Sequence, residues 1–262
     1  MGPPFNERNS RLVWEQALFQ VTSMLRSWGM PPASAGHTAP AFTGPQVIAN
    51  SRLHFRRLAL HVISSAAFGV GLSFSTRSSD DSSEDRFFRD GEPPAGYSRS
   101  WRGALEYMSV NLSFVAVSLA LPAWAAPGAR KSVADVEGYI NTLIRRGRQK
   151  GRSAGDGECG NLLSAMVHSE DKSDPLTDRE IMGNAFAFSV AGHETVAATL
   201  QFALLMLALH PQAQEWFHRR LDEQLSGLSA DPQDWDYKVY DRLSSGRCLF
   251  VTIPSFPSPS PR

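Results

Sequence analysis

The segment from Thr177 to Leu209 constrains the fold of this 262-residue chain more than any other part of its sequence. Thr177 and Glu180 have the spacing of a capping box at the start of a helix. At the other end Pro211 follows His210, and a proline ends one helix but suits the first turn of the next. Apolar residues occur on every side between these signals, which is typical of a helix in the middle of a large fold. We therefore predict a central helix over about 177–209.

The rest of the sequence is typical of a mainly α protein. Apolar residues recur at spacings of three and four, and no run of alternating β-branched residues indicates a strand. We expect further helices over about 6–28, 52–68, 101–121, 131–149, 161–168 and 211–225. Residues 244–262 end in prolines alternating with serines and lack a periodicity that could pack, so they are predicted to be disordered.

Composition and charge exclude several classes of protein. Lys plus Arg and Asp plus Glu number 26 each, so no overall charge attracts nucleic acid or anionic lipid. The two cysteines, Cys159 and Cys248, lie far apart, which argues against a disulfide scaffold and favours a reducing compartment. The central segment is long enough to cross a membrane, but His193 and Glu194 interrupt it. A buried helix explains it better, and a helical membrane protein stays open as an alternative.

The 191–195 segment, Ala191-Gly192-His193-Glu194-Thr195, contains the candidate chemistry. Gly192 costs a helix about 1 kcal/mol relative to alanine, and a buried Glu194 needs a bonding partner or a proton. Thr195 can donate its hydroxyl to the Ala191 carbonyl and bend the helix. Together these features indicate a helix opened beside a bulky partner. The alternative is that Gly192 marks a helix crossing and Glu194 reaches solvent.

Other catalytic motifs are missing from the sequence. A zincin helix needs a second histidine four residues after His193, and Ala197 stands there. The sequence contains neither Gly-x-Ser-x-Gly nor a phosphate loop with Gly-Lys-Ser/Thr. We predict no metal ligand.

Several motifs together resemble the I-helix and J-helix of fungal cytochromes P-450, the haem-thiolate monooxygenases. They are Leu176–Ile181, the 191–195 segment and Leu207–Pro211, with weaker matches at 60–64 and 121–124. The resemblance covers about residues 5–243, so we expect residues 1–243 to form one partial P-450 domain. It implies a mainly α fold from about the end of the C-helix through the J-helix, with the β-rich and haem-cysteine regions missing.

The resemblance also implies roles for the 191–195 segment. Ala191 and Gly192 would lie against the haem, the Thr195 hydroxyl would bond the bound dioxygen, and Glu194 would relay protons to it. The implied partners are a small organic substrate, molecular oxygen and an electron-donating reductase, and no nucleic acid. Complete relatives lie at the endoplasmic reticulum membrane; this sequence shows no anchor, which leaves its own localisation open. These roles require an enclosed helix centre with a hollow beside Thr195.

The sequence departs from the family at the iron ligand. The family pattern is Phe-x-x-Gly-x-Arg-x-Cys, but Asp241, Ser244 and Gly246 occupy its first three fixed positions before Cys248. The Glu-x-x-Arg pair of the K-helix does not occur either. We therefore expect a truncated fragment that does not catalyse the family reaction alone, because the haem iron lacks its thiolate. A non-catalytic helical interaction protein is the second interpretation.

Overall fold

The computed structural model describes residues 7–29, 47–48, 50–72, 74, 88, 93–110, 122, 124–153, 161–168 and 176–252. Its helices are α1 (Glu7–Ser27), α2 (Ser51–Phe68), α3 (Trp101–Val110), α5 (Pro127–Ser153), α6 (Leu162–Val167), α7 (Asp178–Leu209), α8 (Pro211–Leu225), the short 3-10 helix η3 (Pro232–Asp234), α9 (Val239–Arg242) and α10 (Ser244–Thr252). Within these ranges no residue lies in a strand, so the prediction of a mainly α fold is confirmed.

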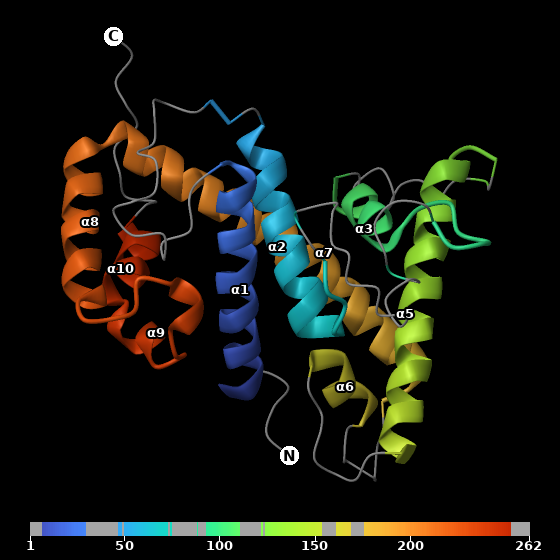
Figure 1. Cartoon of the computed structure of the whole chain (residues 1–262). Coiled ribbons are helices and arrows are strands. Elements are labelled where there is room, and N and C mark those ends of the chain that lie inside the picture. Colours follow the sequence, from blue (N-terminus) through green and yellow to red (C-terminus); the bar gives the residue numbers. More distant parts are fainter. Residues whose placement is uncertain are drawn as a thin grey trace.

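Helix α7 runs diagonally behind α1 and α2 and connects the side of the molecule with α3, α5 and α6 to the side with α8–α10 (Figure 1). Its start follows the local signals of the sequence. The Thr177 side chain accepts from the Glu180 backbone N–H, and the Glu180 carboxylate accepts from the Thr177 backbone N–H, which completes the capping box. At the other end Pro211 begins α8. The observed bounds of α7 therefore agree with the predicted segment.

The main apolar core lies between α2, α3, α5, α6 and the N-terminal half of α7. Leu60, Trp101, Tyr139 and Ile181 are each 0% exposed. Burying such a side chain stabilises the fold by about 1.5–3 kcal/mol. The Trp101 indole N–H remains satisfied because it donates to Ser64 Oγ of α2 at 3.2 Å. In the described part of the chain, this core lies on one side of α7.

A buried polar contact joins α1, α2 and the residues that follow α2. Gln20 Nε2 donates to the Leu72 carbonyl at 2.8 Å, and Gln20 Oε1 lies 3.0 Å from His61 Nδ1. Since an amide oxygen only accepts, Nδ1 carries the proton. His61 Nε2 is buried without a hydrogen-bond partner. Burial, with the nearby charges of Arg102 and Arg57, lowers the pKa of His61 to about 3.

The prediction of disorder from residue 244 onward is wrong for residues 244–252. These residues form α10, and Leu249 is buried against Ala203 and Leu207 of α7. The prolines of the tail begin only at Pro254. The composition that favours disorder therefore does not reach back to residue 244. Residues 253–262 lie outside the described residues.

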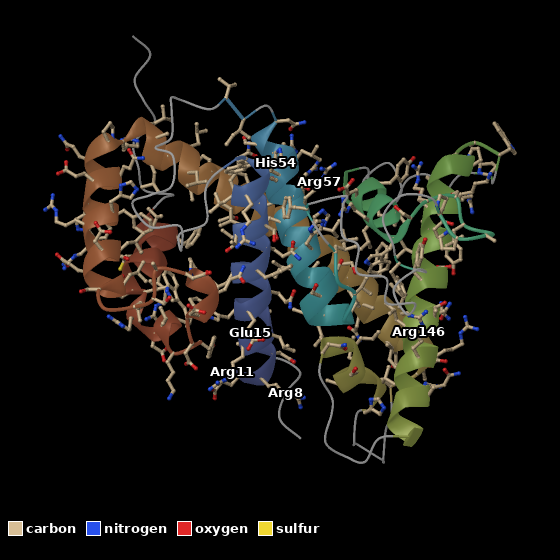
Figure 2. All side chains as sticks on the ribbon, viewed as in Figure 1. Arg8, Arg11, Glu15, His54, Arg57 and Arg146 are labelled. Carbon is tan, nitrogen blue, oxygen red and sulfur yellow. The ribbon has the colours of Figure 1, made fainter. Side chains whose placement is uncertain are left out.

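Charged side chains project from α1, α2 and α5, among them Arg11, Arg57 and Arg146 (Figure 2). Arg11 of α1, for example, pairs with Glu7 at 2.9 Å, and both side chains are largely exposed. Such exposed pairs contribute little to stability. The N-terminal half of α2 carries His54 and Arg57, which are labelled in Figure 2, and also Arg52 and Arg56.

Candidate functional site

The 191–195 segment lies near the middle of α7, where α2 packs against it. Gly192 and Glu194 contact α2 through Ile63 and Arg56, and His193 between them is buried. At about 100° per residue, His193 lies roughly opposite Ala191 and Thr195 on the helix. Ala191 and Thr195 point to the opposite side and are exposed. The structure therefore divides the predicted site residues between two sides of one helix.

Gly192 makes close contact with α2. A Cβ atom at this position would lie 2.6 Å from Ile63 Cδ1, so the glycine leaves room for the Ile63 side chain. The group that lies closest to Gly192 is thus a side chain of α2 and not a bound partner. This placement agrees with the helix-crossing alternative for Gly192.

His193 is buried between the two helices, at 1% exposed. Its Nδ1 lies 3.2 Å from the Ser189 carbonyl one turn earlier, and the Ser189 hydroxyl donates to Ala185 in the same way. Burial lowers the pKa of His193 below its ordinary value, against the raising effects of the Ser189 carbonyl and the Glu194 charge. Nowhere in the described part of the chain do three His, Cys, Asp or Glu residues cluster as metal ligands would.

Glu194 is bound by arginines from α2. Arg56 Nε donates to Oε2 and Arg56 Nη2 to Oε1, each at 2.6 Å, and Arg52 Nη2 lies 3.5 Å from Oε1. Partial burial raises the pKa of Glu194, but the hydrogen bonds and charge of Arg56, with smaller effects from His193 and Arg52, bring it below its ordinary value. The carboxylate is therefore ionised at neutral pH.

Thr195 donates its hydroxyl to the Ala191 carbonyl at 2.6 Å, as the sequence predicted. The same outward side of α7 carries large apolar side chains that are about half exposed: Phe202, Leu205 and Leu209. Ala191 and Thr195 are exposed, so the expectation of an enclosed helix centre is wrong for the described part of the chain. The reason is that an all-round apolar pattern does not say which neighbours exist, and here helices cover one side only.

By length and composition α7 is also apolar enough to span a membrane, and 28% of its most apolar window is buried. A core helix that is covered on one side passes the same test, so this property does not separate the two interpretations.

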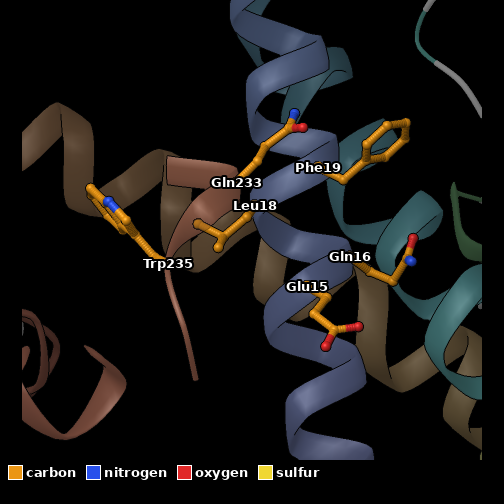
Figure 3. A pocket seen from close by; sticks show the side chains of 6 residues that line it. All are labelled: Glu15, Gln16, Leu18, Phe19, Gln233 and Trp235. Carbon is orange, nitrogen blue, oxygen red and sulfur yellow. The ribbon is translucent and has the colours of Figure 1, made fainter. Parts of the chain in front are cut away.

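A shallow hollow of about 250 Å³ lies between α1 and the residues around η3. It is lined by Glu15, Gln16, Leu18, Phe19, Gln233 and Trp235. Figure 3 shows Leu18 pointing toward Trp235, whereas Glu15, Gln16 and Phe19 lie farther from Trp235 along the same wall of the hollow. Because the polar groups do not converge, this hollow lacks the arrangement of a binding site.

Arg52 and Arg56 are functional candidates that the sequence analysis missed. They are four residues apart in a predicted helix, which places them on one face. A carboxylate inside an apolar helix requires a partner. The pair of arginines is the signal in the sequence from which that partner could have been predicted.

The exposed side of α7 fits one wall of a haem site. Ala191 and Thr195 are one turn apart, and exposed apolar side chains border them. The described residues do not supply the axial thiolate in its family pattern: Cys248 lies exposed on α10, and the residues before it depart from that pattern. Cys159 lies outside the described residues.

Comparisons with known proteins identify one family. The family model for cytochrome P450 matches residues 52–238. A cytochrome P450 monooxygenase of Arthrobotrys oligospora is 28% identical over 249 residues, covering 86% of this chain and 38% of that protein. Cytochrome P450 monooxygenase 124 of Postia placenta is 30% identical over 231 residues, covering 84% and 39%.

Solved structures show the same fold. The crystal structure of the cytochrome P450DA heme domain superposes with a TM-score of 0.66 at 20% identity, covering 97% of this chain and 47% of that chain. This chain therefore spans less than half the length of each of these three relatives.

Proposed function

Because the chain belongs to the cytochrome P450 family, we propose that it supplies the distal wall of a haem monooxygenase site. The reaction is the insertion of one atom of molecular oxygen into a small organic substrate, with electrons from a reductase. The observation that carries this proposal is the position of Ala191 and Thr195, side by side on the uncovered face of the family's central helix.

Each residue of the wall has a role that its position supports. Ala191 offers a small side chain, so that a flat ring can lie close to α7. Thr195 offers a hydroxyl that now donates to Ala191 and can turn outward to donate to a bound ligand. Glu194, one residue earlier, takes up and passes on protons. Gly192 supports the wall from behind through its contact with Ile63. Bound haem supplies the oxygen-activating iron.

The 262 residues alone do not complete this site, because their cysteines do not stand in the family's ligand pattern. We expect this chain by itself to be inactive as a monooxygenase. The uncovered apolar side of α7 should also make it poorly soluble, since exposed apolar patches promote association.

A haem titration followed by a ferrous–carbonyl spectrum tests the proposal. We expect haem to bind to the purified chain without a thiolate-type Soret band, and Thr195→Ala to change the haem spectrum. Arg219→Ala on α8, whose side chain is exposed and pairs only locally with Glu215, is the matched control. A thiolate-type band overturns the expected inactivity, and a Thr195→Ala spectrum identical to the control overturns the distal wall.

A non-catalytic interaction protein is the second candidate, favoured by the exposed leucines on the outward side of α7. In this case Leu205→Asp should abolish partner binding, whereas Thr195→Ala should have no effect on any haem spectrum. A membrane protein would instead require detergent and would protect residues 181–209 from protease.

A further inference from the structure

Helix α10 lies beside α8 (Figure 1) and outside the part of the chain that the family model matches, which ends at residue 238. It is nine residues long, and an isolated helix of that length is marginal in water. Its order therefore depends on the surface that it packs against. That surface, which we call the α7–α8 corner, consists of Ala203, Met206 and Leu207 of α7 with Ala213 and Phe217 of α8.

Two anchors hold α10 on the α7–α8 corner. Leu249 packs into the apolar cluster of the corner and is 6% exposed. At the start of α10, the Gln224 amide of α8 donates to Ser244 Oγ at 2.8 Å and accepts from Ser245 Oγ at 2.6 Å. A helix that is anchored by one leucine and one glutamine can separate and dock again while the rest of the fold stays intact.

A single residue, Leu243, separates α10 from α9. Its φ of −79° is close to that of a helix but its ψ of 51° is not, so the chain turns there. Rotation about this ψ angle would join α9 and α10 into one continuous helix over 239–252. The sequence is compatible with such a helix, because Val239, Leu243 and Phe250 are spaced by four and seven residues and would share one face.

We propose that α10 is an exchangeable arm, which docks on the α7–α8 corner of its own chain or, when Leu243 becomes helical, on the same corner of a second copy of this chain. A second copy is the partner that fits, because its corner is identical. Leu249 meets the same apolar cluster there, and the two serines meet the same Gln224. The exchange is reciprocal, so two arms dock in one symmetric dimer and both anchors are kept.

Cross-linking of paired cysteines tests the exchange in the full chain. Gln224→Cys with Ser245→Cys, in a background of Cys159→Ser and Cys248→Ser, places one thiol on the corner and one on the arm. A short bismaleimide bridges them within one chain when the arm is docked on its own corner, and between two chains when it is exchanged. We expect covalent dimers on a denaturing gel, in a share that rises with protein concentration.

Gln201→Cys with Ser51→Cys is the matched control. This glutamine and serine also join two helices, α7 and α2, with Gln201 Nε2 3.5 Å from Ser51 Oγ, and both lie outside the arm. The control pair should cross-link within one chain at every concentration. Monomers alone from the pair at 224 and 245 overturn the proposal. An equal share of dimers from the two pairs also overturns it, since the association would then not involve the arm.

Substitution of Leu243 gives a second test, which needs no added cysteine. Alanine favours a continuous helix and glycine disfavours it, by roughly fivefold in the equilibrium constant at each hinge. Light scattering should therefore give a dimer dissociation constant that is roughly 25-fold higher for Leu243→Gly than for Leu243→Ala, because the dimer has two hinges. Equal constants, or monomers in both variants, overturn the proposal. Neither measurement involves haem, so this inference and the proposed function can fail separately.

Discussion

The two sides of α7 have very different surroundings. The inward side, which includes Ile181, Ser189 and His193, is buried, and the Ser189 hydroxyl and His193 Nδ1 bond within the helix. The outward side, which includes Phe202 and Leu205, is about half exposed. Because one continuous helix carries both sides, the difference arises from tertiary contacts and not from helix formation. Residues on the inward side should therefore contribute to the stability of the fold. Residues on the outward side should contribute to ligand or partner binding.

Truncation of one large side chain on each side should show the largest contrast. Ile181 is 0% exposed and Leu205 is 52% exposed, both on α7. Ile181→Ala removes packed atoms and leaves a cavity, so the free energy of unfolding should fall by about 2–5 kcal/mol. Leu205→Ala should change it by less than about 0.5 kcal/mol. Urea unfolding followed by circular dichroism measures both.

A similar loss for the two variants would contradict the contrast. It would mean that the outward side is covered in solution, for example by a second molecule. Repeating the Leu205→Ala measurement at tenfold lower protein concentration separates this case, since association makes stability depend on concentration.

Acid should destabilise the fold through His61 of α2. Its pKa in the fold is about 3, against an ordinary value of 6.5. Between these pH values the imidazole therefore binds a proton in the unfolded chain but not in the folded chain. The full stability is therefore present above pH 6.5 and is lost as pH falls from 6.5 toward 3. The expected slope is at most about 1.4 kcal/mol per pH unit, measured by urea unfolding at a series of pH values.

His61→Gln supplies the comparison, because glutamine does not titrate and keeps an N–H donor for Gln20. Its stability should vary less between pH 6.5 and 4 than that of the wild-type chain. Equal pH dependence in the two proteins would show that His61 is not the group that acid protonates.

Local signals in the sequence sufficed for the bounds of α7, because its capping box at Thr177 and its stop at Pro211 act within one turn. These local signals did not predict which helices pack against α7. The pattern between those signals is apolar on all sides, so periodicity could not show which side α2 covers. The same limit applies to α10, where burial of Leu249 against Ala203 depends on residues distant in sequence.

One hydrogen bond of the 191–195 segment was predictable, but the division of the segment between two sides of α7 was not. The Thr195 bond to Ala191 is local and was predicted. The partners of Gly192 and Glu194 lie on α2, more than a hundred residues away, and no local pattern connects such distant positions.

Two glycines of α7 should respond differently to alanine. A Cβ at Gly183 would meet nothing within 4 Å, whereas one at Gly192 would lie 2.6 Å from Ile63 Cδ1. Gly183→Ala should raise the free energy of unfolding by up to about 1 kcal/mol, because alanine favours the helix. Gly192→Ala should gain less, since Ile63 must move. Thermal unfolding of both variants checks this, and equal gains would show that Ile63 does not depend on Gly192.

The smallest effect on stability should come from Thr195. Thr195→Ala removes a hydroxyl that is exposed and bonded only within α7, while alanine favours the helix, so the free energy of unfolding should change by less than about 0.5 kcal/mol. Thr199→Ala is the matched control, since Thr199 is also exposed and donates to the Thr195 carbonyl at 2.8 Å. A loss above about 1 kcal/mol for Thr195 alone would assign its hydroxyl to folding. A near-zero change for both threonines, with an altered haem spectrum for Thr195→Ala only, would assign that hydroxyl to ligand contact, because no requirement of the helix distinguishes the two positions.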